Sequence, residues 1–184
     1  MLTGLLTGIV SIFTGGAAVV DGQRQRGERT DAREAARTGR GAPGTASPGS
    51  VGGTATVEVD PPRATGLRIS YAPERDGDPD AGEVVWTWVP YVENDGRGKD
   101  RPVLILARID GTSVLGCYLS TKQHDGYVSV GTGDWDSSGR ESFMNPERLL
   151  RVTDDGMRRE GSVMGRGSFE KAVAALSREY EELF

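Results

Sequence analysis

Residues 83–119 read EVVWTWVPYVENDGRGKDRPVLILARIDGTSVLGCYL, and this stretch decides the fold. Its first segment, 83–89, is β-branched and aromatic and carries apolar groups on both faces, as in a strand within a small barrel. Residues 102–109 form a continuous apolar run with a proline only at the leading edge, where a strand tolerates it. The dipeptide Asp110-Gly111 is a strong hairpin signal. We therefore expect a further antiparallel strand at 112–119.

Working outward toward the C-terminus, short strands are indicated at 127–130, 142–144 and 149–152. The chain then changes to a helical pattern with Ser168 as its predicted N-cap. The apolar residues that recur at helical spacing are Phe169, Ala172, Val173, Leu176, Tyr180 and Leu183. The pattern predicts a mainly β fold with a C-terminal helix (α+β), in which a strongly curved antiparallel sheet packs against one helix.

The chain before this region has a different composition. Residues 21–65 combine arginines, acidic residues and Gly/Pro/Ser/Thr-rich stretches, so we expect a flexible linker there, with one short polar helix at 30–38. The low hydrophobic content of 36% is due largely to this part. We place the folded domain at 66–184.

Residues 1–20 contain no charged side chain and are long enough to span a membrane. Four glycines dilute the apolar residues, and no basic residue precedes them as in a secretory signal. A weakly apolar tail, a membrane anchor and a signal peptide remain alternatives. The first two leave the domain in the cytoplasm, because the arginines follow the apolar stretch.

Composition also limits the chemistry. Cys117 is the single cysteine and His124 the single histidine, which argues against a disulfide framework, a cysteine-rich zinc site or a histidine cage. We expect neither a metal nor a cofactor. The net charge of −5 gives no overall attraction for nucleic acid, so any such binding needs a local basic patch.

The loop before residue 102 supplies such a patch. Arg97, Lys99 and Arg101 alternate, so in an extended segment all three point the same way. Arg101 lies at the start of the apolar strand, where neighbours can fix its side chain. A positioned arginine offers a planar fork of donors that suits a phosphate. The alternative is a solvated hairpin loop.

A second candidate cluster follows the strand at 112–119. Ser120 and Thr121 supply hydroxyls, and Lys122 and His124 supply further polar groups. If the two strands form a hairpin, Arg101 and Ser120 reach the same end of the sheet and can polarise a phosphodiester without a metal. The alternative is a turn that caps the strand.

Asp134 and Asp136 form a third cluster on either side of Trp135. Both carboxylates share a face if the segment is extended. A glycosidase pair, a metal site and an acidic surface turn all fit this spacing.

Two motifs at a fixed distance carry a family resemblance. The first is Gly82-Glu83-Val84-Val85-Trp86, and the second, after a Gly-containing loop, is KDRPVLIL at 99–106. Together they resemble the opening of the MazF/PemK toxins of type II toxin–antitoxin systems. The strand that ends in Ser120-Thr121 and the SFMNPERL stretch at 142–149 resemble later parts of that family. The likeness covers about residues 80–183.

The resemblance implies a small SH3-like barrel, a homodimer, and a metal-independent endoribonuclease that cleaves single-stranded RNA through attack of the 2′-OH. It maps the catalytic arginine to Arg101 and the catalytic hydroxyl to Ser120, with Thr121 as substitute, whereas Glu83 is expected to be structural. A cognate antitoxin is the implied protein partner.

Basic side chains near these positions are expected to follow the RNA (or DNA) backbone; they are Arg97, Lys99, Lys122 and His124. Trp86, Trp88 and Tyr91 are candidates for stacking on bases, although we expect at least two of the three in the core. Alternatives to a nuclease are a catalytically silent SH3-like barrel that binds nucleic acid or a protein, and a membrane-tethered regulatory protein.

Overall fold

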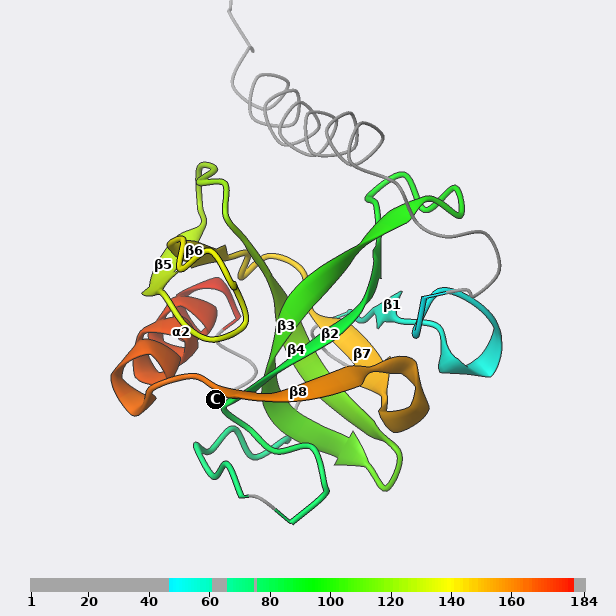
Figure 1. The fold of residues 1–184 in the computed structure, drawn as a ribbon, viewed down its shortest axis with the longest axis horizontal. Coiled ribbons are helices and arrows are strands. Elements are labelled where there is room, and N and C mark those ends of the chain that lie inside the picture. Colours follow the sequence, from blue (N-terminus) through cyan, green and yellow to red (C-terminus); the bar gives the residue numbers. More distant parts are fainter. Residues whose placement is uncertain (1–46, 61–65, 75, 181–184) are drawn as a thin grey trace, which may run out of the picture.

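A computed structural model describes residues 47–60, 66–74 and 76–180 (Figure 1). The apolar segment 1–20 and the helix expected at 30–38 lie outside these residues. Within the described part of the chain, no helix is long and apolar enough to cross a membrane.

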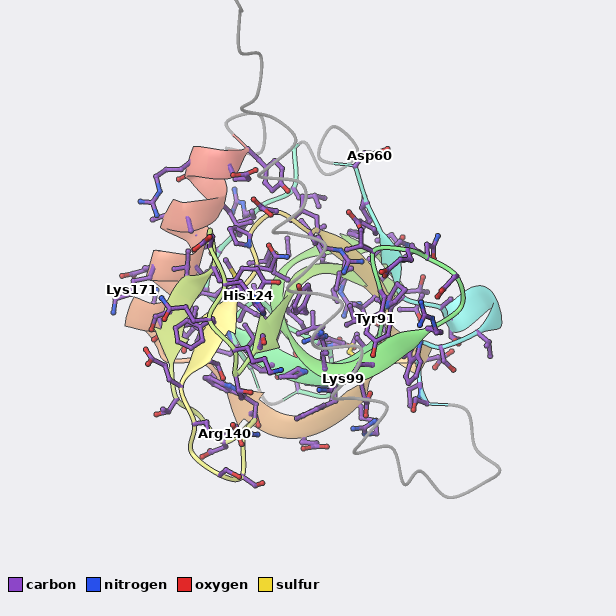
Figure 2. The ribbon with its side chains drawn as sticks, turned by 90° about the horizontal axis from the view of Figure 1, so that it is seen from above. Asp60, Tyr91, Lys99, His124, Arg140 and Lys171 are labelled. Carbon is purple, nitrogen blue, oxygen red and sulfur yellow. The ribbon has the colours of Figure 1, made fainter. Side chains whose placement is uncertain are left out.

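An eight-stranded sheet forms the body of the protein, and every strand pair in it is antiparallel. Its main path runs in the order β1-β7-β4-β3-β2-β8, while β6 pairs with β4 and β5. The strands are β1 (Val57–Glu58), β2 (Glu83–Pro90), β3 (Gly98–Asp110), β4 (Ser113–Ser120), β5 (Val128–Gly131), β6 (Ser142–Met144), β7 (Leu150–Thr153) and β8 (Arg158–Val163). Seen from above, the sheet curves around its own side chains (Figure 2).

The strands at the centre of the sheet are buried on both faces, as the apolar pattern predicted. Along β3, Leu104 and Leu106 belong to one core cluster, and Val103 and Ile105 belong to the other. The first cluster includes the buried residues of the C-terminal helix, and the second lies on the opposite face of β3. This confirms the mainly β architecture.

The predicted hairpin between β3 and β4 is present, with its turn displaced by one residue. Asp110 pairs with Ser113, so the two turn residues are Gly111 and Thr112. The Asp110 carboxylate accepts hydrogen bonds from the Thr112 backbone N–H at 2.8 Å and from the Ser113 hydroxyl at 2.8 Å. These bonds stabilise the turn and lower the pKa of Asp110.

The C-terminal helix α2 spans Arg166–Glu179 and follows a glycine N-cap at Gly165. The prediction that Ser168 caps the helix is wrong, because the helix begins two residues earlier and Ser168 lies in its first turn. Its buried residues are Phe169, Ala172, Ala175 and Leu176. The predicted apolar face therefore packs on the sheet, with Tyr180 buried just beyond it.

The chain before the barrel packs against the sheet from residue 47 onward. β1 pairs with β7, and the backbone N–H of Trp88 donates to the carbonyl of Pro48 at 3.0 Å. The hydroxyls of Thr56 and Thr87 form a buried hydrogen bond of 2.7 Å. We expected a flexible linker up to residue 65, yet residues 47–60 form part of the folded unit.

Strand β8 has no counterpart among the predicted strands. It pairs with β2 at the edge of the sheet, and its Arg159 binds Glu83 with N–O distances of 2.9–3.1 Å. Glu83 is buried in this ion pair, consistent with the structural role expected for it.

Candidate functional site

The pairing of β3 with β4 brings Arg101 and Ser120 together. The β3–β4 pairing ends at Val103 and Tyr118, which lie two residues from Arg101 and from Ser120 along their strands. Arg101 is paired with Thr87 of β2. The hairpin argument predicted that Arg101 and Ser120 reach the same end of the sheet, and both line one pocket there. Their catalytic role stays a prediction.

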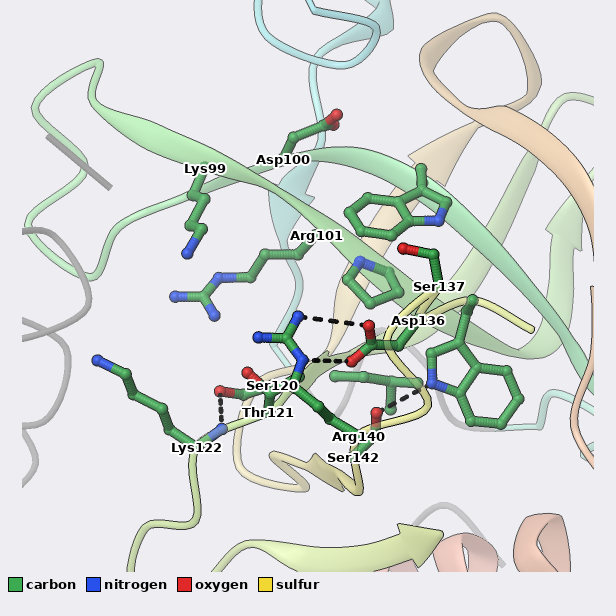
Figure 3. A pocket seen from close by; sticks show the side chains of 14 residues that line it. Lys99, Asp100, Arg101, Ser120, Thr121, Lys122, Asp136, Ser137, Arg140 and Ser142 are labelled. Atoms are coloured by element: carbon green, nitrogen blue, oxygen red, sulfur yellow. Dashed lines mark hydrogen bonds and ion pairs between the residues drawn. The ribbon is translucent and has the colours of Figure 1, made fainter. Parts of the chain in front are cut away.

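A pocket of about 340 Å³ opens at this end (Figure 3). Its lining combines basic side chains, hydroxyls and an apolar floor. The residues are Trp86, Lys99, Asp100, Arg101, Pro102, Leu119, Ser120, Thr121, Lys122, Trp135, Asp136, Ser137, Arg140 and Ser142. Figure 3 shows the Arg101 guanidinium between Lys99 and Arg140, with Ser120 close to it.

Arg101 is only 6% exposed, although it carries a permanent charge. Its guanidinium carbon lies 4.8 Å from the ring centroid of Tyr118, a buried residue of β4. A cation over an aromatic face is stabilised by the ring quadrupole, and more strongly where water is excluded. The pocket therefore contains a positioned arginine rather than a mobile one.

Ser120 is buried at the end of β4, and its Oγ accepts a hydrogen bond from the Lys122 backbone N–H at 3.0 Å. This hydrogen bond corresponds to the turn that caps the strand, which the sequence offered as the alternative interpretation. Because the hydroxyl acts as acceptor there, its own proton remains outside that bond and can be donated. Thr121, the proposed substitute, also lines the pocket but is exposed.

The predicted basic residues separate into two groups. Lys99 and Lys122 line the pocket. Arg97 does not, and forms an exposed ion pair with Asp95 at 2.7 Å that raises the pKa of Arg97 and lowers that of Asp95. His124 also lies outside the pocket lining, with its ring edge-on to Tyr127 at 4.8 Å between centroids.

The loop between β5 and β6 closes one side of the pocket. Trp135 is buried there, and its indole N–H donates to the Ser142 hydroxyl at 3.0 Å. Of the two predicted carboxylates, Asp136 lines the pocket, whereas Asp134 is exposed and does not. The paired-carboxylate hypothesis therefore has only one member at this site.

Sequence reasoning missed Arg140. Its Nε and Nη2 donate to the Asp136 carboxylate at 2.8 and 3.3 Å, and these bonds lower the pKa of Asp136. The only signal in the sequence was the spacing of four residues between Asp136 and Arg140. This spacing predicts an ion pair in a helix, but not in a loop whose backbone conformation is unknown.

The aromatic residues are less buried than expected. Tyr91 is buried, whereas Trp86 and Trp88 are half-buried, so the expectation of at least two in the core is wrong. Trp86 lines the pocket. Within the described residues, its indole N–H and the Oδ1 of Asp100 are buried without a hydrogen-bond partner.

Two other chemistries receive little support from the described residues. No three His, Cys, Asp or Glu side chains within 47–60, 66–74 and 76–180 lie close enough together to hold a metal ion. Burial raises the pKa of the Cys117 thiol to about 12, so this cysteine is not a nucleophile near neutral pH.

Comparisons with known proteins give structural neighbours only. No protein-family model matches the chain, and no curated protein matches it in sequence. A mycobacterial endoribonuclease solved in complex with its cognate antitoxin is 18% identical, with a TM-score of 0.42, covering 55% of this chain and 93% of its own. A MazE-MazF complex from Deinococcus radiodurans is 16% identical (TM-score 0.41; 55% and 94% covered), and MazF from the same organism is 15% identical (TM-score 0.42; 55% and 94% covered).

Proposed function

We propose that this protein is a MazF/PemK-like toxin, a metal-independent endoribonuclease that cleaves single-stranded RNA. The observation that carries the proposal is the buried Arg101, which shares one pocket with Ser120, Lys99 and Lys122. The family motifs around Gly82 and at 99–106 support the same assignment.

The proposed reaction is an internal transesterification. The ribose 2′-OH loses its proton and attacks the adjacent phosphorus, the bond to the 5′-oxygen breaks, and that oxygen takes up a proton. The products are a 2′,3′-cyclic phosphate and a 5′-OH. Arg101 neutralises the charge that develops on the phosphorane, and the Ser120 hydroxyl donates to a non-bridging oxygen. Removing one preorganised donor of this kind typically costs about 10²–10³ in rate.

The rest of the pocket suits the parts of the RNA that flank the cleaved phosphate. Lys99 and Lys122 are placed for neighbouring phosphates, which give affinity without sequence preference. Trp86 presents a half-buried ring on which a splayed base can stack. Thr121 lies at the same rim as a second hydroxyl.

We also propose a homodimer and a cognate antitoxin, both on the strength of the family resemblance. An antitoxin segment that covers the Arg101 pocket would be acidic and apolar, in order to complement the cations and the floor of Pro102, Leu119 and Trp135. Such a segment orders as it binds.

The test is RNA cleavage by the purified full-length protein in EDTA, followed by analysis of the product ends. Arg101→Ala is expected to abolish cleavage and to relieve growth arrest on expression. Arg97→Ala is the matched control, because this arginine lies in the same loop but outside the pocket lining, and it should keep nearly full activity.

Two results would contradict the nuclease. The first is a wild-type protein that neither cuts RNA nor arrests growth. The second is RNA binding without cleavage products that survives mutation of both Arg101 and Ser120, which is the behaviour of the catalytically silent barrel.

A further inference from the structure

Tyr118 occupies a special place beneath the candidate site. It lies on β4 two residues before Ser120 and pairs with Val103, two residues after Arg101. On antiparallel strands these positions share one face of the sheet, so Arg101 and Tyr118 are diagonal neighbours. The ring is 1% exposed, and the Arg101 guanidinium carbon lies 4.8 Å from its centroid.

The Tyr118 ring is itself fixed at its hydroxyl. The side-chain amide of Asn145 donates to the Tyr118 hydroxyl at 3.1 Å, and a second hydrogen bond joins this hydroxyl to that of Tyr127. Asn145 is buried and also donates its backbone N–H to the Tyr118 carbonyl at 3.3 Å. A ring with its hydroxyl held in this way has little freedom to turn away from Arg101.

A second arginine lies against the same ring. The guanidinium carbon of Arg148 is 5.8 Å from the Tyr118 centroid, and the residue is 7% exposed. Its Nε donates to the Glu58 carboxylate at 2.8 Å, and its Nη2 donates to the Pro90 carbonyl at 3.1 Å. Glu58 belongs to β1, so the segment before the barrel reaches this cluster and offsets one of its two positive charges.

We propose that Tyr118 is the positioning residue of Arg101, and that the Glu58–Arg148 ion pair holds the Tyr118 ring in place. An arginine side chain otherwise samples many rotamers, and a phosphate is bound best by a guanidinium whose fork is already aimed. The catalytic consequence rests on the proposed function, whereas the positioning of Arg101 does not.

The first readout needs no RNA. In ¹⁵N-labelled full-length protein, the Arg101 Nε–H resonance is identified by its loss in Arg101→Lys. The ring current of Tyr118 shifts this resonance upfield. Tyr118→Leu should return it to the ordinary arginine range, whereas Tyr118→Phe, which keeps the ring, should leave most of the shift. Glu58→Gln should move it in the same direction as Tyr118→Leu, by a smaller amount.

The second readout is cleavage kinetics. Tyr118→Leu should lower kcat about tenfold with a smaller change in KM, and Tyr118→Phe should recover most of that loss. Val152→Ala is the matched control, because this residue is buried in the same core cluster as Tyr118 but lies outside the pocket lining. It should lower stability without moving the Arg101 resonance.

The outcomes separate the two proposals. An Arg101 resonance that is unchanged in Tyr118→Leu overturns the positioning role, even if RNA is cleaved. An unchanged resonance in Glu58→Gln overturns the part assigned to the ion pair. A wild-type protein that cleaves no RNA defeats the nuclease proposal, while the resonance still decides whether Tyr118 positions Arg101.

Discussion

Asp136 accepts two hydrogen bonds from the guanidinium of Arg140, at 2.8 and 3.3 Å, where both residues line the Arg101 pocket. The contact pairs one of the pocket's basic groups with a carboxylate. An RNA phosphate competes with that carboxylate for the same donors. The pair therefore sets how much positive charge the pocket presents.

Asp136→Asn should tighten RNA binding, because it removes the negative charge that balances Arg140. With a 2′-O-methyl oligonucleotide, which lacks the attacking hydroxyl, the slope of log affinity against log salt should steepen by up to about 0.7. Arg140→Gln should change affinity and slope in the opposite direction. Equal salt slopes for the wild type and Asp136→Asn would contradict this role.

The same pair predicts a pH dependence. Hydrogen bonds from Arg140 hold the pKa of Asp136 below its ordinary value of 3.8, so the carboxylate stays ionised down to a lower pH than a free aspartate does. Its contribution is present above that ordinary value and is lost as the pH falls through the lowered pKa. The affinity difference between the wild type and Asp136→Asn should therefore be constant from about pH 5 to 8. A difference that fades within this range would show that another group is responsible.

Ser120 has two duties that substitutions can separate. Ser120→Ala removes both the hydroxyl proposed to donate to phosphate and the acceptor for the Lys122 N–H. Cleavage should fall by about 10²–10³. Ser120→Thr keeps the hydroxyl and should retain most of the rate, measured in single-turnover assays. If Thr121→Ala lowers the rate as much as Ser120→Ala, the catalytic hydroxyl has been assigned to the wrong residue.

Gly116 of β4 pairs with Ile105 of β3. A Cβ there would come within 2.6 Å of a Val103 methyl and 2.7 Å of the Leu104 carbonyl oxygen. Gly116→Ala should therefore destabilise the protein by about 1–3 kcal/mol in urea unfolding. Gly111→Ala is the control, because no atom lies within 4 Å of its Cβ, and it should change stability by less than about 0.5 kcal/mol. Similar midpoints for the two variants would contradict this packing argument.

Residues 47–60 should contribute to stability. A chain that begins at residue 66 loses the hydrogen bonds from Trp88 to Pro48 and from the Thr153 hydroxyl to Thr54, together with the Glu58–Arg148 ion pair. At roughly 0.5–1.5 kcal/mol for each hydrogen bond, the expected loss is about 2–4 kcal/mol. A chain that begins at residue 47 keeps all of these contacts and should unfold at a higher urea concentration than the one that begins at residue 66. Equal midpoints for the starts at 66 and 47 would show that the segment packs without stabilising the barrel.

The long apolar strands could be predicted because their patterns are local. The two core clusters are built mainly from side chains of β2, β3, β4 and α2. In the sequence, these apolar residues form continuous runs in the strands and recur at helical spacing in the helix. Strand β8 could not be predicted, because it lies at the sheet edge, is largely exposed and lacks an apolar pattern. β1 was missed for a similar reason: its two exposed residues are a strand only because β7 is beside them.

The residues of the candidate site likewise separate into those that a local sequence pattern predicts and those that it does not. Arg101 and Ser120 could be brought together from the sequence because a hairpin register relates them. Arg140 could not, because its place at the pocket depends on how the loop between β5 and β6 folds around Trp135. Arg97 lies just before β3, and its exposed ion pair with Asp95 lies outside the pocket lining, so the predicted alternation does not bring it to the site. The ion pair with the neighbouring Asp95, and not the alternation with Lys99 and Arg101, therefore determines where the Arg97 side chain lies.

The pairing of Glu58 with Arg148 also sets an order in time. The two residues are 90 positions apart, and at about 5–20 residues per second a ribosome needs on the order of 5–20 seconds to pass from one to the other. Arg101, Tyr118 and Ser120 are all made within that interval. A nascent chain therefore carries these residues of the candidate site before it carries Arg148, and the ion pair with Glu58 forms only after residue 148 has been made.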